Sequence, residues 1–268
     1  MTADAMVTFA GLHHRPGEPL LLPNAWDHAS AATLAAHGFP AIGTTSLAVA
    51  AAVGLPDGRG ATREHTLRLA LTLGSESYLL SVDAEDGFAD DPDEVAALAR
   101  ELWTVGVAGI NLEDGLGPRD RHAAKIAAVK AAVPGLFVNA RTDTHWLGDG
   151  DETDTLRRLD AYQQAGADGV FVPGLTDPER IAALVRHVDA PLNILYSPSG
   201  PTVSHLADLG VRRVSLGSLL YRRALGAALE AAVGIAAGRA PGGTTPGYAE
   251  VRALERSVSA SRSANATG

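Results

Sequence analysis

The sequence predicts an α/β protein of the (β/α)8 TIM-barrel class, folded as a single domain with a C-terminal helical extension and a disordered tail. Apolar runs at 78–83, 107–112 and 136–140 end in charged side chains, as expected of strands buried on both faces of a parallel sheet. A glycine that closes a helical pattern precedes several predicted strands by a short loop. Eight strand–helix units in about 240 residues match a barrel in number and size. An open doubly wound sheet, the alternative, usually has fewer strands.

Each element is assigned from its own pattern. The eight predicted strands lie at about 20–24, 40–45, 78–83, 107–112, 136–140, 169–173, 191–195 and 212–216. The helical patterns lie near 28–37, 62–74, 92–105, 120–133, 152–165, 177–187, 202–209 and 218–237. Two helices begin with an aspartate cap followed by a proline, at Asp91 and Asp177, which is a strong helix start. The glycines that end a helix before a strand are Gly38, Gly106, Gly166 and Gly210.

The end of the chain differs in character from the rest. The barrel is expected to occupy residues 1–240, and residues 241–247 form a linker rich in Gly, Thr and Pro. A short helix is expected from Tyr248 to Arg256, followed by a small polar tail that is expected to be disordered. The Ala-rich face of the last barrel helix, Ala224 to Ala237, could pack on a neighbouring molecule.

Composition excludes several classes of function. The net charge is −9 at pH 7, and no Lys/Arg run exceeds two residues, so we expect no nucleic acid or membrane partner. The absence of cysteine removes disulfides, thiolate metal sites and cysteine nucleophiles. No secretory signal and no apolar segment of membrane-spanning length is present. A cytoplasmic location is therefore expected.

The predicted carboxyl ends of three neighbouring strands carry acids. Asp83 and Glu85 follow one strand, Glu113 the next, and Arg141 the third. Active sites of such barrels lie at this end, and carboxylates gathered at one point repel each other unless a cation is bound. Oxygen ligands without cysteine or paired histidines favour Mg²⁺, or Mn²⁺, over zinc. An arginine beside them could bind a substrate carboxylate through two hydrogen bonds.

These residues also carry a family resemblance. The matching stretches are Pro23–Asp27 (Pro-Asn-Ala-Trp-Asp), Thr44–Leu47 (Thr-Thr-Ser-Leu), Gly54–Gly58 (Gly-Leu-Pro-Asp-Gly), Asp83–Gly87 (Asp-Ala-Glu-Asp-Gly), Asn111–Asp114 (Asn-Leu-Glu-Asp) and Asn139–Asp143 (Asn-Ala-Arg-Thr-Asp). In this order they resemble the isocitrate lyase / phosphoenolpyruvate mutase superfamily, from Pro23 to about Gly238. The resemblance implies a Mg²⁺-dependent barrel, a homodimer or homotetramer, that makes or breaks C–C or P–C bonds in small 2-oxo acids.

The resemblance also implies roles for single residues. Asp83 would bind the metal directly, and its water shell would be held by Glu85, Glu113 and Asp57. The backbone N–H groups of Ser46 and Leu47, at the end of the second strand, would form an oxyanion hole. Thr45 precedes them and is grouped with them as catalytic. Arg141 would clamp the substrate carboxylate, with Asn193 among the substrate-binding residues.

Two features depart from the family pattern. The isocitrate and methylisocitrate lyases carry a catalytic cysteine in a Lys-Lys-Cys-Gly-His loop, whereas the stretch from Gly115 to His122 here is short and has no cysteine. Those lyases also carry a tyrosine near the end of the second strand, where this chain has Gly43. The short loop likewise lacks the asparagine-bearing gate of the phosphonate enzymes. The chain therefore resembles a short-loop member without the usual proton handlers.

Structural explanations compete with the functional ones. Asp27 fits a helix cap better than a metal ligand, and Asp57 before Gly58 is a common turn pair. Glu113 could form a purely structural ion pair with Arg141. The remaining side chains split into two groups. Asp114 and Asp143 fit either support of the site or surface charge, whereas His122, His145 and Tyr196 are nearby groups capable of proton transfer that fit structural roles better.

Three functions stay open. The first is a Mg²⁺-dependent lyase or hydrolase that cleaves a C–C bond in a small 2-oxo or 2-hydroxy (di)carboxylate through a metal-stabilised enolate. The second is P–C chemistry of the phosphoenolpyruvate mutase or phosphonopyruvate hydrolase type. The third is a barrel that has lost turnover and binds ligands only. Substrate specificity depends on loops whose conformations the sequence does not give. The sequence therefore does not identify the substrate.

Overall fold

The computed structural model describes residues 8–15, 17–74 and 76–254. Its sheet contains nine parallel strands. They are β1 Leu20–Leu22, β2 Asn24–Ala25, β3 Ala41–Thr44, β4 Leu79–Asp83, β5 Val107–Glu113, β6 Phe137–Arg141, β7 Gly169–Phe171, β8 Leu192–Leu195 and β9 Arg213–Ser215. The hydrogen-bonded order is β1-β9-β8-β7-β6-β5-β4-β3-β2. Each predicted strand is present, and the predicted (β/α)8 barrel is confirmed.

The ninth strand arises because the first predicted strand is divided at Pro23. Proline has no N–H to give to a ladder, so β1 and β2 are recorded on either side of it. β1 pairs with β9, and β2 pairs with β3. The Pro23 carbonyl still accepts a 2.8 Å hydrogen bond from Gly43 N. The two short strands together therefore close the sheet into a ring.

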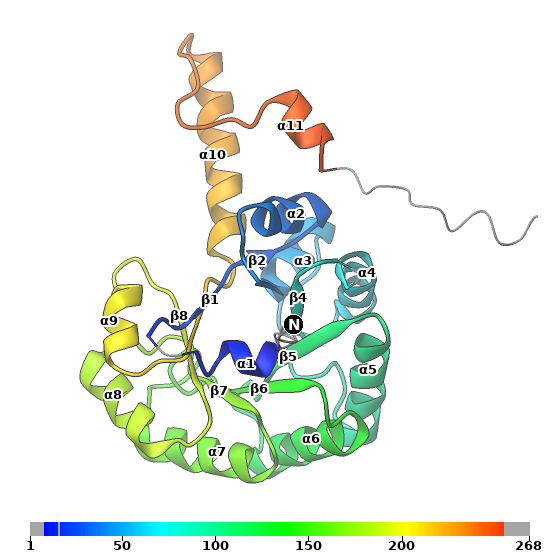
Figure 1. Cartoon of the computed structure of the whole chain (residues 1–268), viewed down its shortest axis with the longest axis vertical. Coiled ribbons are helices and arrows are strands. Elements are labelled where there is room, and N and C mark those ends of the chain that lie inside the picture. The colour runs from blue at the N-terminus through cyan, green and yellow to red at the C-terminus, as the bar shows by residue number, and fades with distance from the viewer. Residues whose placement is uncertain (1–7, 16, 75, 255–268) are drawn as a thin grey trace, which may run out of the picture. The chain divides into compact units, whose positions relative to one another are not determined.

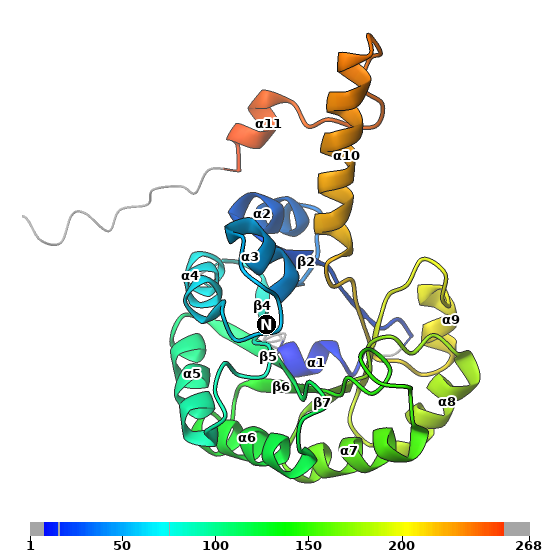
Figure 2. The ribbon, with the colours of Figure 1, turned by 180° about the vertical axis from the view of Figure 1, so that it is seen from behind.

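The described residues form eleven helices, most of which lie around the outside of the barrel (Figures 1 and 2). They are α1 Phe9–Leu12, α2 His28–Ala36, α3 Ser46–Val53, α4 Arg63–Leu73, α5 Pro92–Thr104, α6 Arg119–Ala132, α7 Glu152–Gln164, α8 Pro178–His187, α9 Val203–Asp208, α10 Leu219–Ala236 and α11 Tyr248–Arg252. The caps that the sequence indicates are present: Asp91 and Asp177 each accept a backbone hydrogen bond from the first turn. The four glycines that precede strands all adopt positive φ, between 87° and 99°, which L-residues rarely adopt.

Helix α3 is absent from the sequence prediction. Its residues Ser46–Val53 are almost all small or apolar, so they show no amphipathic period to recognise. The helix starts directly after β3, with Thr45 at the N-cap. Its first turn therefore lies at the carboxyl end of the barrel, next to the predicted site.

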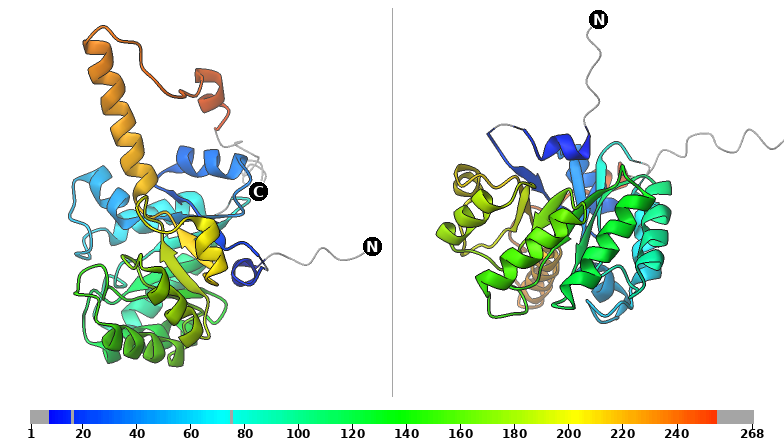
Figure 3. Two further views of the ribbon diagram at one scale, coloured as in Figure 1. Left: turned by 90° about the vertical axis from the view of Figure 1, so that its left-hand side faces the viewer. Right: turned by 90° about the horizontal axis from the view of Figure 1, so that it is seen from below.

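The opposite end of the barrel is closed by α1. Phe9 packs edge-on against Phe137, the first residue of β6, with ring centroids 5.3 Å apart. Leu12, Leu20 and Ala41 belong to the same buried cluster. Figure 3 shows α1 at one end of the strands, with the larger helices along their sides. Among the described residues, apolar side chains therefore fill this end of the barrel.

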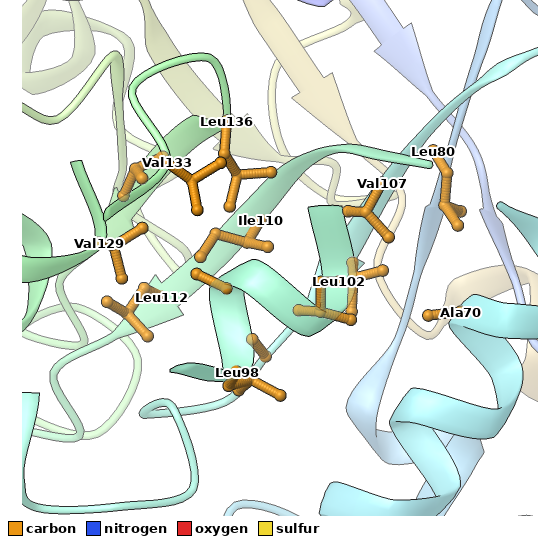
Figure 4. Packing of buried hydrophobic residues seen from close by; sticks show 14 of the residues in the cluster. Ala70, Leu80, Leu98, Leu102, Val107, Ile110, Leu112, Val129, Val133 and Leu136 are labelled. Atoms are coloured by element: carbon orange, nitrogen blue, oxygen red, sulfur yellow. The ribbon is translucent and has the colours of Figure 1, made fainter. Parts of the chain in front are cut away.

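The largest apolar cluster lies between the strands and helices α5 and α6 (Figure 4). Leu102 on α5 is fully buried there among Leu80, Val107 and Ile110. Leu102→Ala should lower the free energy of unfolding by about 2–5 kcal/mol, because it removes apolar contacts and leaves a cavity. Urea denaturation monitored by circular dichroism checks this. Leu71→Ala, at a side chain that is 63% exposed, is the matched control and should change stability little.

The chain divides into two compact units, residues 1–225 and 226–268. The boundary between these two units lies within α10, Leu219–Ala236. In the second unit the expected short helix is present as α11, Tyr248–Arg252. The expected disordered tail lies outside the described residues. None of the helices in the described ranges combines the length and hydrophobicity needed to span a bilayer.

Candidate active site

Three charged side chains end three adjacent strands. Asp83 is the last residue of β4, Glu113 of β5 and Arg141 of β6. Glu113 and Arg141 are partners in the β5–β6 register. Because parallel strands end at one edge, the sequence prediction that these three side chains converge is supported by the strand ends and by the ion pair that joins two of them.

Asp83 is oriented by the beginning of α3. Its Oδ2 accepts a 3.0 Å hydrogen bond from Ser46 N, and its own N–H donates to Thr44 Oγ1 at 2.9 Å. Burial raises the pKa of Asp57, and the nearby Ser46 side chain opposes that shift. Ser46 thus interacts with two predicted metal-binding acids. The positive end of the helix dipole at α3 favours an anion here.

The Ser46 N–H differs from its expected role in an oxyanion hole. Ser46 N–H is already hydrogen-bonded to Asp83, whereas the resemblance implies that it faces a substrate oxygen. Leu47 is the second residue of α3, so its N–H belongs to the same first turn, where helices leave N–H groups without helical acceptors. Thr45 is the buried N-cap residue, and its side chain makes no capping hydrogen bond.

Arg141 lies between two acids. Its Nη1 contacts Glu113 Oε2 at 2.7 Å, and its Nε and Nη2 both contact Asp143 Oδ1 at 2.6 Å. A guanidinium has five N–H donors, and these contacts use three of them. Two donors are left for another acceptor. Arg141 is therefore both a structural ion-pair partner, as the competing explanation proposed, and a group able to bind a carboxylate.

The pKa of Glu113 is strongly affected by the neighbouring charges. Burial raises its pKa to about 8, against the opposing effect of Arg141, and the negative charges of Asp83, Asp143 and Glu85 raise it further. Such mutual effects require that the groups lie near one another. The acids therefore form one electrostatic cluster with more negative than positive charge, which is the environment that a divalent cation stabilises.

Hydrogen bonds to both of its oxygens hold the Glu85 carboxylate in place. It adopts a left-handed φ of 48°, an unfavourable conformation for a residue with a side chain. Its Oε2 accepts a 3.0 Å hydrogen bond from Gly60 N, and its Oε1 accepts one from the Thr62 hydroxyl. Burial raises its pKa. Glu85 thereby ties down the loop between α3 and α4, on which Asp57 lies.

Asp114 and Asp143 are buried, and their hydrogen bonds hold neighbouring residues of the site in place. Asp114 is buried and accepts hydrogen bonds from Tyr162 and Arg158, at 2.7 and 3.0 Å. Its other oxygen accepts one from Asp143 N at 3.1 Å. Although burial opposes it, hydrogen bonds from Leu116, Tyr162 and Asp143 keep the pKa of Asp114 below its usual value. Both aspartates are support residues rather than surface charges.

The remaining sequence candidates have other partners in the described part of the chain. Asp27 caps α2 through a capping box with Ser30, as expected. His122 is buried edge-on against Tyr162, and burial lowers its pKa to about 4, so it is neutral at pH 7. Tyr196 packs against the second apolar cluster. Asn193 is buried on β8, where its Nδ2 donates to Ser215 Oγ at 3.0 Å.

A divalent cation such as Mg²⁺ or Ca²⁺ needs several oxygen ligands around it. In the described part of the chain, no three His, Cys, Asp or Glu side chains are arranged to hold one ion directly. Asp83 Oδ1, however, is buried and has no hydrogen-bond partner among these residues. An orphaned carboxylate oxygen is unfavourable unless a cation or donor meets it. The site therefore fits one direct ligand, Asp83, with neighbouring acids reaching a cation through water.

The raised pKa of Glu113 predicts a pH-dependent stability. A carboxyl whose folded pKa lies above its unfolded value makes the folded state bind more protons, so stability falls as pH rises between the two values. The lowered pKa values of His13 and His122 change the stability with pH only below pH 6.5. Between pH 6.5 and pH 8, in the presence of a metal chelator, the free energy of unfolding should fall by about 1 kcal/mol. Glu113→Gln should make this fall smaller. A free energy of unfolding that rises over this pH range in the wild type would contradict the prediction.

Sequence reasoning missed the residues that hold the acids in place. Thr44 and Thr62 contact the Asp83 backbone and the Glu85 carboxylate, respectively. Thr44 could have been inferred from its place at a strand end. Thr62 lies 23 positions from its partner, and no local pattern indicates that contact.

Comparisons with known proteins agree with this geometry. Residues 9–236 match the family model described as phosphoenolpyruvate phosphomutase. The protein Rv1998c of Mycobacterium tuberculosis (strain ATCC 25618 / H37Rv), which is uncharacterised, is 45% identical over 252 residues, covering 92% of this chain and 95% of its own.

Two further relatives have names that refer to an activity. The 2-methylisocitrate lyase of Bacillus subtilis (strain 168) is 30% identical over 203 residues, covering 70% of this chain and 66% of its own. A candidate phosphonomutase from Burkholderia cenocepacia J2315 has a solved structure with 37% identity and a TM-score of 0.78, covering 84% of this chain and 97% of its own. The chain is an enzyme that belongs to the phosphoenolpyruvate mutase / isocitrate lyase superfamily of C–C lyases and mutases.

Proposed function

We propose that this enzyme is a Mg²⁺-dependent lyase that cleaves a C–C bond in a small 2-oxo or 2-hydroxy (di)carboxylate. The proposal is carried by one juxtaposition: the unpartnered Oδ1 of Asp83 and the two open N–H donors of Arg141 belong to one charge cluster. A cation held by Asp83 and a guanidinium together can bind both ends of a chelating 2-oxo or 2-hydroxy acid. The 2-methylisocitrate lyase relative supports this class of reaction.

The residues have distinct roles in this proposal. Arg141 binds the substrate carboxylate, and its paired acids Glu113 and Asp143 fix the guanidinium plane. Ser46 orients Asp83, and Glu85 holds the loop that carries Asp57. When bound, Mg²⁺ supplies positive charge against the enolate that bond cleavage leaves. The Leu47 N–H, in the first turn of α3, would add to that stabilisation.

Phe171 contributes by excluding water. It is the last residue of β7, is 4% exposed, and its ring centroid lies 5.9 Å from the Arg141 guanidinium carbon. A cation over an aromatic face is stabilised electrostatically. The apolar ring also keeps solvent from one side of Arg141. A carboxylate bound to Arg141 therefore forms its ion pair where little water competes for the hydrogen bonds.

The proposal is tested with a panel of 2-hydroxy and 2-oxo dicarboxylates and Mg²⁺, with release of a 2-oxo acid as the readout. At least one member should be cleaved, EDTA should stop the reaction and Mg²⁺ should restore it. Binding of oxalate with Mg²⁺ but no cleavage across the panel would contradict a lyase and favour a ligand-binding barrel.

A second candidate is P–C chemistry on a phosphonopyruvate-type substrate. The 37% identity to a candidate phosphonomutase, over 84% of this chain, supports it. The same carboxylate and cation contacts could hold a phosphonate analogue. Phosphate release, or phosphoenolpyruvate formation, from phosphonopyruvate would favour this candidate over C–C cleavage.

A further inference from the structure

Arg213 is a buried cation that the roles above do not use. It is the first residue of β9 and is 1% exposed. Its Nε donates to Ser215 Oγ on the same strand, and its Nη2 donates to Asn111 Oδ1 on β5, both at 3.0 Å. Three strands separate β9 from β5 in the sheet order. The guanidinium therefore lies across the barrel interior rather than along its wall.

Among the residues that the structure describes, no acidic side chain forms an ion pair with Arg213. Both of its hydrogen-bond acceptors are neutral, and Nη1 is buried without a partner in the ranges that the structure describes. Burial lowers its pKa to about 9, and the negative charge of Asp83 raises it, so it is still a cation at pH 7.5. An isolated buried charge is strongly unfavourable. The compensating charge must come from a distance, and Asp83 is the acid that supplies it.

Arg213 is also linked to the strands that carry the site. Asn111 Oδ1 accepts a second hydrogen bond from Asn139 Nδ2, at 2.8 Å. Asn111 lies two residues before Glu113 on β5, and Asn139 lies two residues before Arg141 on β6. Residues two apart in a strand point to the same side. The guanidinium is therefore hydrogen-bonded to the layer of side chains directly adjoining the charge cluster.

We propose that Arg213 is a positioning residue whose buried positive charge balances the acid cluster, so that the site favours a cation and an anionic substrate together over the cation alone. This inference rests on the proposed function. A fixed positive charge repels a divalent cation at Asp83 and attracts the dianion that binds with it, and a low-dielectric interior screens neither effect strongly. The charge should thus act with opposite sign on the two ligands.

Arg213→Met and Arg213→Lys separate charge from shape. Methionine fills much of the space and removes the charge, and neither acceptor loses its last donor, because Asn193 still donates to Ser215 and Asn139 to Asn111. Lysine keeps the charge. Arg212→Met is the matched control, since it removes the same charge from an exposed neighbouring side chain that water screens. Circular dichroism confirms that each variant is folded, and Arg213→Gln replaces Arg213→Met if that variant does not fold.

The assay is calorimetric titration at pH 7.5, first with Mn²⁺ and then with oxalate added to the Mn²⁺-loaded protein. In Arg213→Met, Mn²⁺ should bind about tenfold tighter and oxalate about tenfold more weakly. Arg213→Lys and Arg212→Met should resemble the wild type. Weaker binding of both ligands, or no change in either, would overturn the inference while leaving the proposed function intact. A wild type that binds neither ligand would overturn both.

Discussion

Asp83→Asn is expected to remove measurable Mg²⁺ binding and to lower turnover by at least about a thousandfold, because the metal supplies several kcal/mol of barrier lowering. The substitution keeps the shape of the side chain and an acceptor oxygen for Ser46 N, so the hydrogen bond that orients it can persist. What it removes is the charge on a buried oxygen that lacks a hydrogen-bond partner among the described residues. Asp83→Ala should have the same effect without unfolding the barrel.

Mg²⁺ titration and the cleavage assay measure this effect, and thermal unfolding shows whether the barrel is intact. Asp90→Asn is the matched control. Its carboxylate lies on the same connection after β4, pairs with Arg121 and has a side chain that is 82% exposed, so its loss should change activity little. Turnover of Asp83→Asn within a few-fold of the wild type would show that Asp83 is not the direct metal ligand.

Arg141→Lys should weaken oxalate binding to the Mg²⁺-loaded enzyme by about a hundredfold or more. Lysine retains the charge between Glu113 and Asp143, which limits the destabilisation that an uncharged residue would cause. Its three donors cannot satisfy both acids and still present the planar pair of N–H groups that binds a carboxylate. Removing one partner of a hydrogen-bonded charge pair commonly costs about 2–5 kcal/mol.

Mg²⁺ binding distinguishes this effect from general damage, since Arg141 is assigned to the substrate rather than to the metal. Arg141→Lys should leave Mg²⁺ affinity within a few-fold of the wild-type value. Arg119→Lys is the control because the Arg119 side chain is 41% exposed and pairs with its neighbour Asp120. Unchanged oxalate affinity in Arg141→Lys would assign the carboxylate to a different group.

The fold could be predicted because its signals are local. A glycine that must adopt positive φ, an aspartate before a proline and an apolar run each indicate an element without reference to the rest of the chain. Two features escaped this reasoning. Pro23 divides a strand that hydrophobicity alone shows as continuous, and α3 consists of small and apolar residues without a period.

The site could be predicted only as a set of strand ends. Asp83, Glu113 and Arg141 were expected to meet because parallel strands end together, and the ion pair between Arg141 and Glu113 is consistent with that. Their partners could not be predicted. The Ser46 contact depends on the unexpected helix α3, and the Arg213 contact joins residues 102 positions apart across the closed barrel.

Equilibrium binding of Mn²⁺ to the wild-type enzyme, with and without oxalate, tests the central assignment most directly. One cation should bind per chain, oxalate should increase its affinity, and Asp83→Asn should abolish both signals. A wild type that shows no Mn²⁺ binding, or binding that Asp83→Asn leaves intact, would contradict the assignment of these strand ends as a metal and carboxylate site.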